Sequence, residues 1–493
     1  MKKLYFLVIA ALLGAGLATA QPARPKLVVG IVVDQMRWDY LYTYYNNWGE
    51  GGFKRLLDEG FSCQNTIIDY IPTVTAIGHA SVYTGSVPAL HGIAGNNFII
   101  DGRHVESVTD TTVVGVGTTG KAGKHSPRNL WALTIGDQLK LATNMQGRVV
   151  SVAIKDRASI LPGGHSADAA YWYDGDTHSF ITSTYYMNEL PKWVKSFNSN
   201  HSDDLRHNVK DEPQGVMVTL GMAREALINE QLGQDDVTDL LAISVSTTDA
   251  AAHQFGTHSA QVDAAYRQLD TELASLFSLL DKRVGKGNYL VWLTADHGGT
   301  NDRIYMDERR MPSAGWLSGK ALEAVNEELK ARFGIDNLIK AQKQFTFYLD
   351  NELIEQWHLN RDAVKRVACE TLAMPHEVMW AIDMENVGTA PVPQVIKERL
   401  IKGYVKGRSG EIAIVPRVYV YAGNDKQHGS QHGTLTQSDS HIPLVFMGWG
   451  VGHGETFART GIVDIAPTIC ALLHIQAPNA AIGNPILQVI ESK

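Results

Sequence analysis

The sequence predicts an α/β fold, in which a mostly parallel central sheet is flanked by helices and covered in part by capping insertions. The first observation is a set of short, nearly continuous apolar runs rich in Val, Leu and Ile. Such runs are typical of strands buried on both faces, because polar and apolar residues alternate only when one face meets water. The second observation is that amphipathic segments of helix length separate the runs. The third is that charged side chains follow the runs directly, at the end where open α/β sheets bind ligands.

The chain begins with the pattern of a secretory signal peptide at residues 1–20. Lys2 and Lys3 precede an apolar run at residues 4–17, and the small residues Ala18 and Ala20 follow at cleavage spacing. The run is too short to span a bilayer, and no second run of spanning length follows, so we expect no stable membrane anchor. We expect a secreted protein, with the periplasm as its compartment and extracellular release as the alternative.

Four apolar runs predict buried strands at residues 27–33, 149–154, 240–245 and 289–294. Amphipathic segments at residues 130–142 and 260–280 predict helices. After residue 411 the strand pattern returns at residues 412–420 and 442–447, which we assign to the same sheet. Two stretches, at about residues 174–214 and 301–406, do not follow this alternation of strands and helices and are expected to be insertions. Residues 21–493 are therefore predicted to form a single catalytic domain with two insertions.

The charge balance excludes some partners. The chain has 44 Lys and Arg against 52 Asp and Glu, for a net charge of -8, so we expect no binding of nucleic acid. An anionic substrate would need locally placed cations. The three cysteines allow at most one disulfide and lack the Cys-x-x-Cys spacing of a structural zinc site. No pattern in the chain predicts an oligomeric state.

Six acidic and histidine residues form the strongest constellation, and most of them follow an apolar run. They are Asp34, Asp249, His253, Asp296, His297 and His432. Asp249 and His253 are four residues apart and would share one face of a helix. Mixed carboxylate and imidazole ligands suit zinc or a similar transition metal better than magnesium or calcium. Six ligands could hold two metals, an arrangement that suits phosphoryl transfer. The alternative is that these histidines, among 18 in the chain, serve surface or capping roles.

Two further motifs contain a candidate nucleophile and a pair of cations. In the segment Ile71-Pro-Thr-Val-Thr75, a proline turn leads into a predicted helix, so the Thr75 hydroxyl would lie at a helix N-terminus, where negative charge is favoured. An ordinary capping role for Thr75 is the alternative. In Lys155-Asp156-Arg157, an extended chain would point Lys155 and Arg157 to one face and could direct both at a phosphate dianion. The alternative is that Lys155-Asp156-Arg157 is an ordinary charged segment on the protein surface.

In these motifs the chain resembles the alkaline phosphatase superfamily. Within it, the chain is most similar to the PafA-type, phosphate-irrepressible alkaline phosphatases, a branch near the nucleotide pyrophosphatase/phosphodiesterases. The resemblance spans nearly the whole mature chain. It rests on landmarks that include Val33-Asp34-Gln-Met-Arg-Trp-Asp-Tyr40, Pro72-Thr-Val-Thr75, Gly95-Asn96, Lys155-Asp-Arg157, Ala295-Asp-His297-Gly-Gly299 and Asp464-Ile-Ala-Pro467. The resemblance implies an alkaline phosphatase-like fold.

The resemblance also implies a site with two Zn²⁺ ions. One zinc would be held by Asp34, Asp296 and His297, and the other by Asp249, His253 and His432. His432 is preferred to His428 because it stands nine residues before His441, the spacing of the family. Thr75 would be the nucleophile and would form a phosphothreonine intermediate.

The same resemblance assigns substrate contacts to three residues. Asn96, which stands 21 residues after Thr75 as in the family, would donate to a phosphate oxygen. Lys155 and Arg157 would contact the dianion of a small-molecule phosphate monoester, where diesterases of the superfamily have apolar residues. The alternative within the superfamily is a phosphodiesterase or nucleotide pyrophosphatase. The alternative of another class is a catalytically silent module that binds phosphate.

Overall fold

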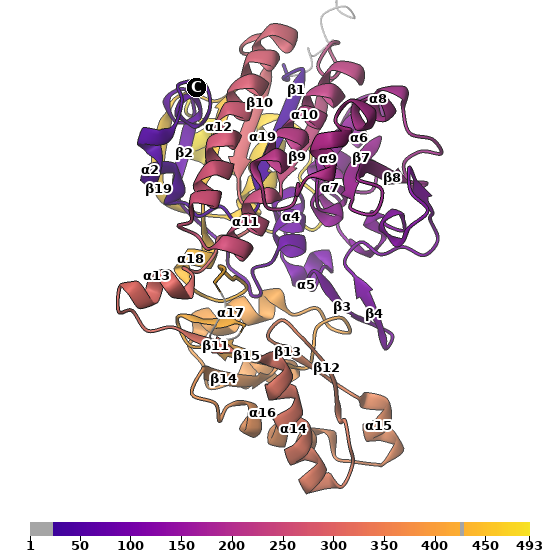
Figure 1. The fold of residues 1–493 in the computed structure, drawn as a ribbon, viewed down its shortest axis with the longest axis vertical. Coiled ribbons are helices and arrows are strands. Elements are labelled where there is room, and N and C mark those ends of the chain that lie inside the picture. Colours follow the sequence, from indigo (N-terminus) through magenta and orange to yellow (C-terminus); the bar gives the residue numbers. More distant parts are fainter. Residues whose placement is uncertain (1–22, 424–427) are drawn as a thin grey trace, which may run out of the picture.

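A computed structural model describes residues 23–423 and 428–493, and its largest element is an 11-stranded sheet (Figure 1). The strand order is β17-β2-β18-β10-β1-β9-β6-β7-β8-β5, and β19 also pairs with β2. The predicted signal peptide lies outside the described residues. Within the described residues, no helix combines the length and the apolar character needed to cross a membrane.

The four predicted buried strands form the middle of this sheet. They are β1 (Leu27–Val33), β6 (Val149–Ala153), β9 (Asp239–Val245) and β10 (Tyr289–Thr294), and all of their residues are buried. They pair in parallel in the order β10-β1-β9-β6, as the loss of alternation predicts. Gly30 in β1 lies opposite Trp292, and a Cβ at this position would come within 2.3 Å of the indole ring. The mostly parallel α/β class is therefore confirmed.

The outer strands complete the sheet. They are β2 (Phe61–Ile67), β5 (Gly115–Val116), β7 (Ala169–Asp174), β8 (Ser179–Ser183), β17 (His441–Ile442), β18 (Leu444–Gly448) and β19 (Gly454–Gly461). β18 runs antiparallel to β10, and β8 runs antiparallel to β7. Residues 174–214, expected as an insertion, thus contribute β8 to the sheet between β7 and the edge strand β5, followed by α8 (Lys192–Asn200) and α9 (Ser202–Arg206).

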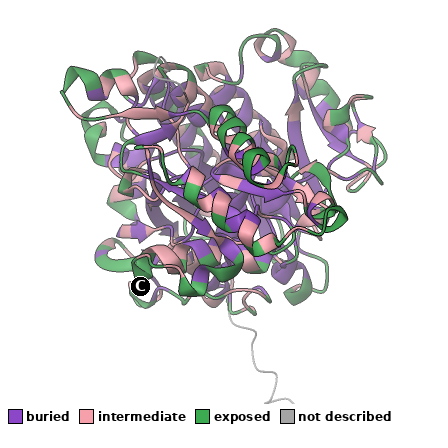
Figure 2. Ribbon diagram, turned by 90° about the horizontal axis from the view of Figure 1, so that it is seen from below, coloured by how far each residue is buried: buried purple, intermediate pink, exposed green. Residues whose placement is uncertain are grey.

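Two groups of helices flank the sheet, and Figure 2 shows buried strands inside a layer of half-exposed helices. One group contains α10 (Pro213–Asn229), α11 (Thr247–Phe255) and α12 (Ala260–Leu280), and the other contains α4 (Thr75–Thr84), α6 (Ile135–Ala142), α7 (Asp156–Gly163) and α19 (Ile465–Leu472). α12 matches the predicted helix at residues 260–280. α6 begins later than predicted, because Thr134 and Asp137 form a capping box that fixes its start.

A second, smaller body lies beside the central sheet, at the bottom of Figure 1. Its four-stranded antiparallel sheet has the order β12-β13-β15-β14 and packs against its own hydrophobic core. Its strands are β12 (Ile339–Lys343), β13 (Thr346–Leu349), β14 (Val378–Asp383) and β15 (Ile412–Pro416), and its main helices are α14 (Ser318–Phe333), α16 (Arg361–Leu372) and α17 (Gln394–Gly403).

The assignment of residues 412–420 to the central sheet is wrong. β15 joins the four-stranded sheet, and β16 (Val420–Ala422) pairs with β11 (Ala314–Trp316) in a separate two-stranded sheet. An apolar strand pattern reports burial, but it does not report which sheet the strand joins. Residues 442–447, by contrast, lie in β17 and β18 of the central sheet.

Arg408 fixes the second body against the first. Its Nη1 donates hydrogen bonds of 2.6 Å to the carbonyl oxygens of Gly92 and Asn129, and its guanidinium lies 4.2 Å from the ring centroid of Trp131. Burial lowers the pKa of Arg408 to about 10. The contact holds the loop that leads to Asn96.

Candidate functional site

Acidic and histidine side chains meet at the carboxyl end of the central sheet. Asp34 follows β1, Asp296 and His297 follow β10, and Asp249 lies in the first turn of α11, just after β9. Because β9, β1 and β10 are parallel neighbours, these side chains lie at one edge of the sheet. His432 reaches the same place from the segment before α18 (Gln437–Ser440).

The structure brings all six predicted ligand residues together. Donor atoms of Asp34, Asp296 and His297 lie within 4.8 Å of one another, as do those of Asp249, His297 and His432. His253 joins the second group, because its Nε2 lies 3.2 Å from Asp249 Oδ1. His297 therefore lies between the two groups. The residues of this acid–histidine cluster are Asp34, Asp249, His253, Asp296, His297 and His432. His428, the weaker candidate, is exposed.

Backbone carbonyls orient the three histidines of the cluster. In each ring Nδ1 lies at hydrogen-bond distance from a carbonyl oxygen, which can only accept, so Nδ1 carries the proton. The neutral Nε2 is then left with a lone pair for a cation, as in metal-binding histidines. The pairs are His253 with Ser430 at 2.7 Å, His297 with Gly298 at 2.8 Å, and His432 with Thr73 at 2.7 Å.

Several buried polar atoms of the cluster have no hydrogen-bond partner within the described part of the chain. They are Asp34 Oδ1, Asp296 Oδ2 and His297 Nε2. Unpaired polar atoms of this kind are costly in a protein interior, and a bound cation would satisfy all three. The donor set of three carboxylates and three imidazoles fits zinc or a similar transition metal. The cluster therefore has the chemistry of a metal centre.

Lys155 provides the positive charge nearest to these carboxylates. Its Nζ lies 2.7 Å from Asp34 Oδ2 and 2.5 Å from Asp249 Oδ2. Burial acts to lower the pKa of Lys155, but Asp249 and Asp34 raise it above the ordinary value. Burial, followed by repulsion from Asp249 and Asp296, raises the pKa of Asp34 to about 7. The carboxylates thus carry more negative charge than one lysine offsets, as a cation site requires.

Thr75 lies at the start of α4, beside the cluster. It is the first helical residue, is 1% exposed, and follows Val74 as the N-cap, so its hydroxyl makes no capping bond. A Cβ at Gly78, one turn further on, would meet the carbonyl oxygen of Asp296 at 2.2 Å. Only glycine permits this close approach, which packs the first turn of α4 directly on the acid–histidine cluster.

Asn96 is held at the same end of α4. Its Oδ1 accepts a hydrogen bond of 2.9 Å from the backbone N–H of Ala76. Since this bond occupies the carbonyl side of the amide, the Nδ2 group is left to donate to another partner. Thr75 and Asn96, the second of which was selected by its family spacing of 21 residues from the first, therefore lie close together.

Lys155 and Arg157 are close to each other, but not in the predicted way. β6 ends at Ala153 and α7 begins at Asp156, so Lys155 is an N-cap and Arg157 lies in the first helical turn. The expected extended chain is wrong because the helix begins directly after Lys155. The charge of Arg157 is nevertheless near enough to oppose part of the rise in the pKa of Lys155, and its buried Nε has no hydrogen-bond partner among the described residues.

The second body contributes contacts that the sequence did not predict. A Cβ at Gly95 would lie 3.1 Å from Gln344 Oε1, and one at Gly433 would lie 3.6 Å from Phe345 Cε2. The turn between β12 and β13 thus reaches the loops beside Asn96 and His432. No periodic pattern could have indicated this contact, because it depends on how two separately folded bodies pack.

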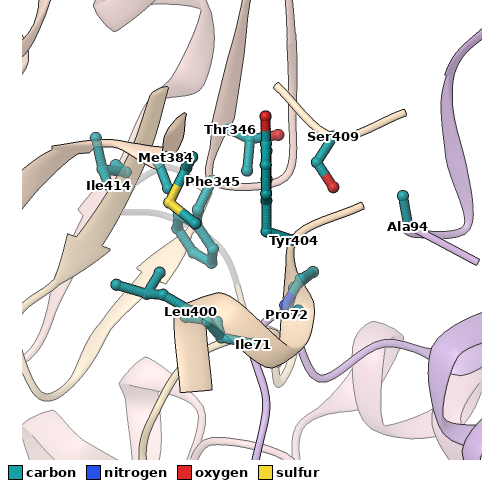
Figure 3. A pocket seen from close by; sticks show the side chains of 12 residues that line it. Ile71, Pro72, Ala94, Phe345, Thr346, Met384, Leu400, Tyr404, Ser409 and Ile414 are labelled. Atoms are coloured by element: carbon teal, nitrogen blue, oxygen red, sulfur yellow. The ribbon is translucent and has the colours of Figure 1, made fainter. Parts of the chain in front are cut away.

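An apolar cavity lies at this junction (Figure 3). From the first body, Ile71 and Pro72 precede Thr75, and Ala94 precedes Asn96. Side chains of the second body, which include Phe345, Met384, Leu400 and Tyr404, also line the cavity. The segments that carry Thr75 and Asn96 therefore pack directly on the second body.

Comparison with known proteins identifies relatives over nearly the whole chain. The type I phosphodiesterase / nucleotide pyrophosphatase family matches residues 28–440. Alkaline phosphatase PafA of Elizabethkingia meningoseptica is 42% identical over 98% of both chains. Alkaline phosphatase PhoV of Synechococcus elongatus is 41% identical over 95% of this chain and 94% of its own. A protein of Myroides odoratus named calcium-transporting ATPase is 43% identical over 97% of both chains.

Solved structures that resemble this chain include one of these relatives. The crystal structure of wild-type PafA matches with a TM-score of 0.92 at 42% identity, over 95% of this chain and 99% of that chain. A PafA variant, with one threonine replaced by serine and an asparagine, a lysine and an arginine each replaced by alanine, matches with a TM-score of 0.91. Murine ectonucleotide pyrophosphatase/phosphodiesterase 5 shares the fold alone, with a TM-score of 0.56 at 14% identity.

Proposed function

The chain belongs to the type I phosphodiesterase / nucleotide pyrophosphatase family and, within the alkaline phosphatase superfamily, to the PafA-type alkaline phosphatases; it is therefore a phosphoric monoester hydrolase, and we propose that it uses two zinc ions and a phosphothreonine at Thr75. The observation that carries this proposal is the packing of the first turn of α4 on the acid–histidine cluster. This packing supports the proposal because Thr75, whose side chain makes no capping bond, begins the helical turn that contacts Asp296 of the cluster.

The substituted residues of the PafA variant support the assignment of four residues. In that protein the threonine and asparagine are 21 residues apart, and the lysine and arginine are two apart. Thr75 and Asn96, and Lys155 and Arg157, have the same order and the same two spacings in this chain. We therefore assign Thr75 as the nucleophile and the other three as contacts of the phosphate group.

In the proposed reaction, Oγ of Thr75 attacks phosphorus, and the bond from phosphorus to the alcohol oxygen breaks. Hydrolysis of the phosphothreonine by water then releases phosphate and restores the hydroxyl. Asn96 donates from Nδ2 to one phosphate oxygen, while the cations of Lys155 and Arg157 hold the oxygens on which negative charge is concentrated. The two zinc ions, held by the six residues of the cluster, would supply the positive charge that favours ionised threonine and the departing oxygen.

The remaining parts of the proposal concern secretion, domain organisation and substrates. We propose that residues 1–20 direct secretion to the periplasm and that residues 21–493 form one catalytic domain with two insertions. The substrates would be small-molecule phosphate monoesters. Because Lys155 and Arg157 are two cations at the substrate position, a dianionic monoester is favoured over a monoanionic diester.

The test compares an aryl phosphate monoester with its methyl diester at alkaline pH, with and without a chelator. We expect a preference for the monoester that chelation abolishes and added zinc restores. Lys155→Ala and Arg157→Ala should each lower monoester kcat/KM by about 10- to 100-fold and affect the diester less, since a hydrogen bond to a charged group contributes about 1.5–3 kcal/mol. Lys195→Ala, which removes an exposed ion pair, is the matched control.

Three outcomes would count against parts of the proposal. A preference for the diester would identify a phosphodiesterase that uses the same cluster. Equal losses on the two esters in the Lys155 and Arg157 variants would refute the role of these cations. Absence of turnover on both esters, with phosphate still bound, would identify a phosphate-binding module.

A further inference from the structure

A third group of acidic and histidine residues lies outside the acid–histidine cluster. It consists of Glu106 at the end of β4 (Arg103–Glu106), His125 in the loop before α6, and Asp156 at the start of α7. His125 is 6% exposed, and its Nδ1 lies 3.0 Å from Asp156 Oδ2. Its Nε2 faces the exposed Glu106, with Oε2 at 3.7 Å. The imidazole of His125 therefore has a carboxylate at each of its nitrogens.

Asp156 connects this histidine to Arg157. Its Oδ1 accepts a hydrogen bond of 2.6 Å from the backbone N–H of Arg157 and lies 3.7 Å from Nη1 of the same residue. Its Oδ2 faces His125. Because the two carboxylate oxygens have different partners, Asp156 cannot rotate without losing both contacts. The carboxylate also lies in the first turn of α7, where the helix dipole favours negative charge.

The loop that carries His125 is itself held in place. Ser183 Oγ donates a hydrogen bond of 2.8 Å to the carbonyl oxygen of His125. The next residue, Ser126, donates from Oγ to Asp110 Oδ2 at 2.6 Å. The imidazole is thus a fixed support for the carboxylate of Asp156.

The side chain of Arg157 depends on this support. Its buried Nε has no hydrogen-bond partner in the described part of the chain, and the carboxylate that the structure shows beside its guanidinium is Asp156. An arginine that binds a phosphate needs N–H groups that no other acceptor occupies. Its orientation must therefore be fixed by a neighbouring residue that leaves these groups available.

The three residues of this group lie close enough to hold a metal, but the charges favour a protonated histidine. Burial acts to lower the pKa of His125, whereas the adjacent carboxylate of Asp156 and the charge of Glu106 raise it above the ordinary value. Arg157 acts against this rise. An imidazolium places one positive charge between the two carboxylates, whereas a divalent ion would lie beside the guanidinium of Arg157.

We propose that His125 is a positioning residue, which acts through Asp156 to orient Arg157 toward the second negative charge of a phosphate monoester. This inference rests on the proposed role of Arg157. It predicts that His125 contributes to monoester hydrolysis and contributes little to diester hydrolysis, because a diester has no second charge for Arg157 to meet.

The test uses three variants of the full-length, zinc-loaded enzyme. His125→Leu removes both donors, His125→Asn keeps an N–H near the position of Nδ1, and Glu106→Gln alters only the exposed contact. We expect His125→Leu to lower monoester kcat/KM about tenfold or more and to change diester kcat/KM less than about twofold, because a charged hydrogen bond contributes about 1.5–3 kcal/mol. His125→Asn should recover most of the loss, and Glu106→Gln should stay within about twofold of the unmodified enzyme.

A double-variant cycle separates positioning from a general structural role. In an Arg157→Ala background, His125→Leu should cause no further loss, since the residue that it positions is gone. Equal losses on monoester and diester, a further loss in the Arg157→Ala background, or loss of one metal equivalent in His125→Leu would each overturn the inference.

The inference and the proposed function can fail separately. If Arg157→Ala alone leaves the monoester-to-diester ratio unchanged, the proposed role of Arg157 is wrong. If Arg157→Ala changes that ratio and His125→Leu does not, only the role of His125 is wrong. The thermal midpoint of each variant shows whether the protein is folded under the assay conditions.

Discussion

At the scale of single residues, Thr75 combines a free hydroxyl with a fixed position at the start of α4. If it is the nucleophile, Thr75→Ala should lower kcat on an aryl monoester to background, while metal content and thermal midpoint stay close to those of the unmodified enzyme. Thr75→Ser keeps a hydroxyl and should retain measurable turnover. Thr84→Ser, at the last position of the same helix, keeps its bond to the carbonyl oxygen of Ala80 and is the control. Full activity of Thr75→Ala would contradict the assignment.

Residues that follow a buried strand were the easiest to predict. Asp34, Asp249 and Asp296 come directly after recognisable apolar runs, so the topology of a parallel sheet brings them together. His432 follows no such run in the central sheet, and only the resemblance to a family selected it over His428. The extended backbone predicted at Lys155 and Arg157 was wrong because a helix can begin directly after a buried strand. The supporting role of His125 depends on a contact between its loop and the first turn of α7, which no spacing reveals.

At the scale of elements, an ion-pair group ties α16 to the segment after β14. Glu385 contacts the guanidinium of Arg361 and lies 2.9 Å from Lys365 Nζ. The hydrogen bond from Arg361, followed by that from Lys365, lowers the pKa of Glu385 to about 2. A carboxyl whose pKa is lower in the folded state than in the unfolded state adds stability at neutral pH. This contribution is lost as the pH falls from about 4.5 toward 2.

We therefore expect Glu385→Gln to lower the thermal midpoint at pH 7 and to approach the unmodified protein as the pH falls from 5 to 3. Scanning calorimetry across this range measures the difference between the two proteins. Glu355→Gln, at an exposed site, should show no such trend and is the matched control. A difference that stays constant or grows on acidification would contradict the assigned role of the ion pairs.

The elements also differed in how well they could be predicted. The strands β1, β6, β9 and β10 were recognisable because burial on both faces removes the alternation of polar residues. The strand β15 has an equally apolar sequence, yet it belongs to the second body. Hydrophobicity records that a segment is buried, and the choice between two sheets is made by long-range pairing that composition does not record.

At the scale of the whole molecule, the acid–histidine cluster connects segments from Asp34 to His432. Three buried carboxylates face one lysine ammonium there, so removal of bound metal would leave repulsion at the edge of the central sheet. We expect chelation to lower the thermal midpoint, and we expect zinc to restore it in a concentration-dependent manner, because a ligand that binds only the folded state stabilises it. Equal midpoints with and without metal would contradict a metal centre at this position.

The span of the cluster also has a consequence for biosynthesis. A ribosome makes the chain from its N-terminus, so Asp34, Asp249 and Asp296 all leave the exit tunnel before His432 has been added. The second body, which includes residues 314–422, is translated between Asp296 and His432 and can collapse around its own core in that interval. The full donor set therefore exists only near the end of translation, and capture of the complete metal complement must be one of the last steps in the maturation of the enzyme.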